Sequence, residues 1–96
     1  MRPYLLRPRA IQDLEEIADY TFEKWGSEQE DFYLELLEKA FVAVTKNPNI
    51  GRIYDEIHPC LRRYLAGRHI ILYQVSDVAI EIVRVLHHSM DFESHL

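Results

Sequence analysis

The chain has 96 residues, a hydrophobic fraction of 48% and a formal net charge of −5. This length accommodates one domain, residues 1–96, and the hydrophobic fraction is that of a globular rather than a disordered chain. The negative charge argues against general nucleic-acid binding, in which Lys and Arg neutralise phosphates. No apolar stretch approaches the roughly 20 residues that a membrane span requires.

The sequence favours a cytoplasmic location. Cys60 is the single cysteine, so no intrachain disulfide can form, which suits a reducing compartment. The first residues, MRPYLLRPRA, lack the long apolar stretch of a secretion signal.

The first part of the chain predicts an edge strand and then an amphipathic helix. Residues 3–7 are short, apolar and bounded by prolines, and Pro8 suits a first helical turn because its missing N–H is not needed there. The predicted buried stripe of the helix is Ile11, Leu14, Ile17, Ala18, Thr21 and Trp25. Its acidic residues, Asp13, Glu15, Glu16, Asp19 and Glu23, are expected on a solvated outer face. Gly26 ends this helix.

A second helix is predicted to pack against the first as an antiparallel hairpin. Ser27 and Glu30 have the spacing of a capping box at its start. Its apolar stripe is Tyr33, Leu36, Leu37, Ala40, Phe41 and Val44. Asn47 precedes Pro48 and stops the helix, because a residue before proline avoids helical angles.

Residues 47–60 are expected to form a loop, and three β-rich runs follow at 61–66, 69–75 and 78–87. Short connections predict that these strands pair antiparallel, and the helical hairpin must bury its stripes against one face of the sheet. The sequence therefore predicts a two-layer α+β domain with the order β–α–α–β–β–β.

Residue types that support catalysis or cofactor binding are not grouped in the sequence. His87 and His88 are adjacent and are expected to point to opposite faces of a strand, and Cys60 has no base nearby. The three glycines form no nucleotide-binding pattern. We therefore expect no metal site, no cofactor and no catalytic residue.

A basic cluster is the main functional candidate. Its members are Arg52, Arg62, Arg63, Arg68, Arg84 and His87, with Tyr54 and Tyr64. Residues 57–76 contain no acid, so the cluster could bind an acidic partner segment or an RNA phosphate. Alternatively, these are ordinary strand charges paired with acids such as Glu56, Glu81 or Asp91.

Several short motifs resemble the ParE toxins of bacterial toxin–antitoxin systems, within the RelE/ParE superfamily. They are AIQDLEEIADY (10–20) followed by Trp25-Gly26, NPNIGR (47–52), LRRYLAGRHIILYQV (61–75) and IEIVRVLHHSMDF (80–92). Their order and spacing, over nearly the whole chain, are specific to the family.

The resemblance implies a toxin that inhibits DNA gyrase by binding and that a ParD-like antitoxin holds inactive. We expect an antitoxin helix to enter a groove between the helical hairpin and the sheet. The residues predicted to bind the antitoxin are Arg62, Arg63, Tyr64, Arg68, Arg84 and His87.

Two alternatives remain open at this point. The RelE branch of the superfamily cuts mRNA on the ribosome, and Arg63, Arg84, His87 and His88 could supply part of a catalytic set. A strongly basic surface is expected of such a nuclease, whereas this chain is acidic, so inhibition by binding is favoured. The other alternative is an inactive member that binds only its antitoxin.

Overall fold

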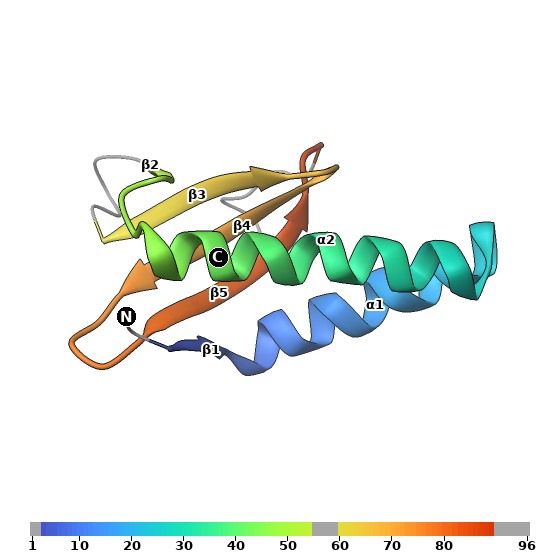
Figure 1. Ribbon diagram of the computed structural model, residues 1–96, viewed down its shortest axis with the longest axis horizontal. Coiled ribbons are helices and arrows are strands. Elements are labelled where there is room, and N and C mark those ends of the chain that lie inside the picture. Colours follow the sequence, from blue (N-terminus) through green and yellow to red (C-terminus); the bar gives the residue numbers. More distant parts are fainter. Residues whose placement is uncertain (1–2, 55–59, 90–96) are drawn as a thin grey trace.

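The computed structural model describes residues 3–54 and 60–89, in which a helical hairpin lies across one face of a five-stranded sheet (Figure 1). The elements are β1 (Tyr4–Leu6), α1 (Pro8–Trp25), α2 (Ser27–Lys46), β2 (Arg52–Ile53), β3 (Leu61–Ala66), β4 (His69–Val75) and β5 (Ile80–His87). The predicted α+β class is confirmed, and β2 is an additional short strand in the segment that was expected to be a loop.

The two helices are separated by one residue, Gly26. Its φ of +93° is a conformation that glycine adopts without a Cβ penalty, and its N–H donates to the Phe22 carbonyl. The capping-box prediction is wrong, because Gly26 itself is the N-cap of α2 and no side chain caps the helix. The turn is so short that Ser27 is already the first helical residue.

The core lies between α2 and the middle of the sheet. Leu37, Phe41 and Val44 of α2 are buried together with Ile71 and Tyr73 of β4, as the apolar stripe of this helix predicted.

The stripe predicted for α1 is wrong at both ends. Ile11 is 44% exposed and Trp25 is 53% exposed, whereas Ala10 and Asp13 are buried. Figure 1 shows the reason for the exposed end: the turn between the helices projects past the strands, so the last residues of α1 have no sheet beneath them.

The strand order is β1-β5-β4-β3-β2. Strands β3, β4 and β5 pair antiparallel, as predicted, and β1 is an edge strand. However, β1 pairs parallel with β5, which makes the sheet mixed. No tight turn connects these two strands, so nothing forces them to run in opposite directions.

Strand β5 extends beyond its neighbour β1. The pairing of β1 ends at Leu6 opposite Ile82, after which the chain turns into α1. The β4–β5 register shifts here, because Leu72 pairs with Arg84 and Tyr73 with Ile82, so Val83 is an extra residue. Past Ile82, therefore, α1 rather than a strand lies beside β5.

Neither helix in the described part of the chain is apolar enough over a sufficient length to cross a membrane.

Candidate functional site: a cleft beneath the helical hairpin

The structure divides the predicted basic cluster between the two faces of the sheet. Arg62 and Tyr64 are on the helix-covered face, where Arg62 Nη1 donates to the Gly51 carbonyl at 2.7 Å and Tyr64 packs against the core. Arg63 is exposed on the opposite face, with Arg52 of β2 as its cross-strand partner. These arginines therefore do not line a common cleft.

Arg84, which was predicted to bind the antitoxin, is buried and paired within the chain. It is 8% exposed, and its guanidinium donates through Nε and Nη2 to the two carboxylate oxygens of Asp13, each at 2.8 Å. These hydrogen bonds raise the pKa of Arg84 above its ordinary value. Glu56 and Asp91, two of the acids suggested as partners for the strand arginines, lie outside the described residues.

Asp13 closes the open edge of β5. Besides binding Arg84, its carboxylate accepts the backbone N–H of Val85 at 2.9 Å. This N–H lies past the end of β1 and would otherwise lack a strand acceptor. The prediction that Asp13 belongs to a solvated acidic face is wrong, because the residue is 7% exposed and replaces the missing end of a strand.

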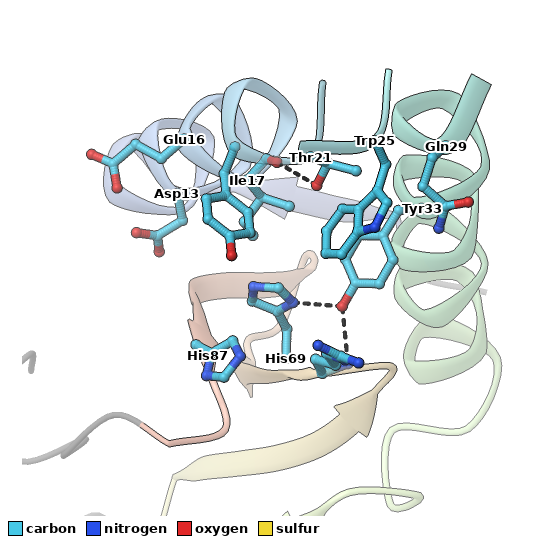
Figure 2. Close-up of a pocket in the computed structure, with 11 residues that line it drawn as sticks. Asp13, Glu16, Ile17, Thr21, Trp25, Gln29, Tyr33, His69 and His87 are labelled. Carbon is cyan, nitrogen blue, oxygen red and sulfur yellow. Dashed lines mark hydrogen bonds between the residues drawn. The ribbon is translucent and has the colours of Figure 1, made fainter. Parts of the chain in front are cut away.

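A cleft of about 400 Å³ opens at the same end of the molecule, between the hairpin and the sheet (Figure 2). We call it the hairpin cleft. It is lined by Asp13, Glu16, Ile17, Tyr20, Thr21 and Trp25 of α1, Gln29 and Tyr33 of α2, Arg68 in the β3–β4 turn, His69 of β4 and His87 of β5. Two of the six residues predicted to bind the antitoxin, Arg68 and His87, are among them.

Tyr33 connects the helical wall of the cleft to its floor. Its hydroxyl accepts the backbone N–H of Arg68 at 2.9 Å and lies 2.5 Å from Nδ1 of His69 (Figure 2). Because Arg68 already donates to the Tyr33 oxygen, the hydroxyl proton is left for Nδ1. Burial raises the pKa of Tyr33 above its ordinary value.

His69 is held neutral at the floor of the cleft. Burial, followed by the nearby His87 and His88, lowers its pKa from 6.5 to about 4, although Asp13 opposes this shift. The rings of His69 and His87 meet edge to face with centroids 5.4 Å apart.

His87 and His88 do not point to opposite faces as predicted. Their rings stack with centroids 4.5 Å apart, because β5 ends at His87 and strand alternation stops there. Within residues 3–54 and 60–89, no three His, Cys, Asp or Glu side chains are grouped as metal ligands.

The rim of the cleft is aromatic. Tyr20 and Trp25 are 57% and 53% exposed, and their rings meet edge to face with centroids 6.2 Å apart. The Lys24 ammonium donates to the Tyr20 hydroxyl at 3.2 Å and lies 5.2 Å from the centroid of the Trp25 ring.

Most of the cleft was not predicted from the sequence. Trp25 was expected in a buried stripe, Tyr33 packs partly against the core as expected but also lines the cleft, and Tyr20 was given no role. Helix length was no signal, because helices of 18 and 20 residues span about 27 and 30 Å and the eight-residue β5 spans about 26 Å; the overhang comes from where the hairpin lies along the sheet (Figure 1).

Comparisons with known proteins agree on one family. A family model for the ParE toxin of the type II toxin–antitoxin system, parDE, matches residues 4–92. Toxin ParE1 of Mycobacterium tuberculosis strain H37Rv is 45% identical over 94 residues, which cover 97% of this chain and 96% of that protein. Toxin ParE1 of Caulobacter vibrioides is 36% identical over 96 residues, which cover 100% and 99% of the two chains.

A solved structure supports the fold independently. A chain of the chromosomal ParDE TA system from P. aeruginosa superposes with a TM-score of 0.78, covering 91% of this chain and 96% of that one. Its sequence identity is 18%, so the likeness concerns the fold alone.

Proposed function

Because the chain belongs to the ParE toxin family of type II toxin–antitoxin systems, we propose that it inhibits DNA gyrase by binding, and that a ParD-like antitoxin neutralises it by placing a helix in the hairpin cleft. The observation that carries the antitoxin part is the aromatic rim of this cleft. Two large aromatic side chains, Tyr20 and Trp25, remain more than half exposed there.

The shape and composition of the cleft suit a helix. Its upper wall is α1, its side wall is α2, and its floor is formed by His69 and His87 (Figure 2). An amphipathic helix buries its apolar stripe in such a groove, and Trp and Tyr are the side chains that most often dominate binding energy. A partner in this position would cover the aromatic surface that the chain alone leaves in water.

Inhibition by binding is favoured over catalysis by the state of Arg84. The catalytic set suggested from the sequence uses Arg84 as a cation where negative charge develops, and the Arg84 guanidinium is instead bound to Asp13. The net charge of −5 is also opposite to that expected of a protein working among ribosomal phosphates.

One observation favours the ribosome-dependent endoribonuclease as a second candidate. Tyr33, His69 and Arg68 converge on the cleft with His87 close by, so that titratable groups and a cation lie together, with the Tyr33 hydroxyl bound to Nδ1 of His69. Primer extension on cellular mRNA after induction of the toxin decides this point. New cleavage sites would support the nuclease, and unchanged transcripts would eliminate it.

Gyrase inhibition is tested with purified toxin in a plasmid supercoiling assay. We expect loss of supercoiling or accumulation of gyrase-cleaved DNA, and filamentous cells with an SOS response after induction. Normal supercoiling with rapid translation arrest would contradict the proposal. Unchanged growth without antitoxin would instead identify an inactive member that binds only its antitoxin.

The proposal that the antitoxin binds in the hairpin cleft is tested by truncating an aromatic side chain at its rim. Trp25→Ala should weaken antitoxin binding by about thirtyfold or more, since truncating a hot-spot tryptophan that the partner covers costs about 2 kcal/mol or more. Phe22→Ala is the matched control, because Phe22 is 52% exposed on the same helix and does not line the cleft. Equal affinities of the two variants, measured by calorimetry, would place the antitoxin elsewhere.

A further inference from the structure

We infer that the hairpin cleft fixes the direction in which a partner helix binds: a basic side chain of the partner lies at the Glu16 end, and an acidic side chain lies at the end marked by Arg68 and Lys24. This inference rests on the proposed function, in which the cleft holds an antitoxin helix. It adds the charge pattern and the polarity that the partner must have.

One end of the cleft is cationic. The backbone of Arg68 is anchored by the Tyr33 hydroxyl, while its side chain is exposed and lines the cleft. Lys24 lies at the Trp25 edge of the same end, over the Tyr20 and Trp25 rings. In residues 3–54 and 60–89, neither cation is within ion-pair distance of an acid.

The other end of the cleft is anionic because of Glu16. Figure 2 shows Asp13 and Glu16 at one end and Trp25 and Tyr33 at the other. Asp13 contributes no net charge here, since Arg84 neutralises it through two hydrogen bonds. Glu16 is an exposed acid in the lining, and among the described residues no ion pair involves it.

Uncharged residues line the middle of the cleft. Its central group, His69, has a pKa of about 4 and therefore carries no charge. Ile17 and Thr21 form the upper wall between the charged ends and contribute no charge either. A partner helix thus meets these three uncharged residues with a cation beyond one end and an anion beyond the other.

Charge of this kind acts mainly on orientation. Correct pairing at the rim adds little affinity, but a reversed helix would place like charges together at both ends, and such contacts are costly. An apolar stripe alone is nearly symmetric and permits either direction. The charged ends therefore decide which direction prevails, and we expect a preference of about tenfold.

The test uses two synthetic amphipathic peptides with the same leucine stripe and composition. One carries glutamates near its N-terminus and lysines near its C-terminus, and the other carries the reverse order. Each has a nitroxide label at its N-terminus, and its position is read from the broadening of backbone amide signals of the isotope-labelled toxin. The label should broaden Arg68 with the first peptide and Glu16 with the second.

Exchanging the charges at the two ends of the cleft tests whether these charges set the direction of the bound helix. The double variant Glu16→Lys with Arg68→Glu should exchange the broadened ends, and both residues are exposed, so the fold should tolerate it. The control double variant, Glu15→Lys with Arg9→Glu, changes exposed residues of the same charges that do not line the cleft, and it should leave the pattern unchanged.

The outcomes separate the inference from the proposal on which it rests. If both peptides broaden signals at the same end, or if the charge swap leaves the pattern unchanged, charge does not set the direction of the helix. The inference is then overturned, while the cleft remains the binding site of the helix. If neither peptide affects signals of the cleft and Trp25→Ala leaves antitoxin affinity unchanged, the proposal that the antitoxin binds in the hairpin cleft is wrong.

Discussion

Replacing Asp13 with alanine should destabilise this protein more than removing any exposed acid. The Asp13 carboxylate accepts from Nε and Nη2 of Arg84 at 2.8 Å each and from the Val85 N–H at 2.9 Å. Both side chains of the ion pair are 9% exposed. Alanine therefore leaves a guanidinium and a backbone donor in a site that excludes most water.

The expected loss of unfolding free energy in Asp13→Ala follows from the burial of this ion pair. Breaking a buried ion pair by removing one partner typically costs 3–5 kcal/mol, and an unpaired buried backbone donor costs about 1–3 kcal/mol. These contributions overlap, because Arg84 is long and can regain water by swinging outward once Asp13 is gone. We therefore expect a loss of about 3 kcal/mol, a large share of the roughly 5–15 kcal/mol that stabilises a small domain.

The measurement is urea-induced unfolding followed by circular dichroism. Glu15→Ala is the control, since Glu15 is an exposed acid on the same helix and its removal changes the net charge equally. The double variant Asp13→Leu with Arg84→Met should be more stable than Asp13→Ala, because it removes the stranded charge. If Asp13→Ala unfolds within about 1 kcal/mol of Glu15→Ala, the edge-closing role assigned to this carboxylate is refuted.

Three further predictions concern single residues. Tyr73→Phe removes a buried hydroxyl that accepts the Gly51 N–H at 2.9 Å and donates to the Pro48 carbonyl at 2.7 Å. The free energy of unfolding in urea should therefore fall by about 1–3 kcal/mol, and a loss below about 0.5 kcal/mol would contradict this. Gly67→Ala should lower the melting temperature, because φ there is +60° and a Cβ would come within 2.8 Å of the Tyr33 hydroxyl; an unchanged melting temperature would show that the turn relaxes freely. Because the pKa of His69 is lowered from 6.5 to about 4, the unfolded chain binds more protons between these values, and stability should fall as pH drops through that range. His69→Asn, which keeps an acceptor near the Nδ1 position, should reduce this fall, and equal losses in both proteins between pH 7 and 5 would exclude His69 as the source.

Much of the fold could be predicted because it is encoded in local patterns. The period of apolar residues in α2, the proline at the start of α1 and the β-rich runs after residue 60 each predict one element without knowledge of the others. The order of these elements and the family motifs then indicated the two-layer class and a ParE-type toxin. The same local patterns could not show that β1 runs parallel to β5, since that pairing joins the two ends of the described chain.

The sequence alone determined the elements, the α2 core face and the uneven distribution of charge, because each depends on residues close together along the chain. Only the tertiary structure decided which charges remain free. Asp13 and Arg84 are 71 positions apart, and they pair because β1 stops short and leaves an edge of β5 for α1 to close. The cleft likewise arises because the turn of the helical hairpin projects past the strands (Figure 1), and this depends on how the hairpin is placed on the sheet rather than on any residue by itself.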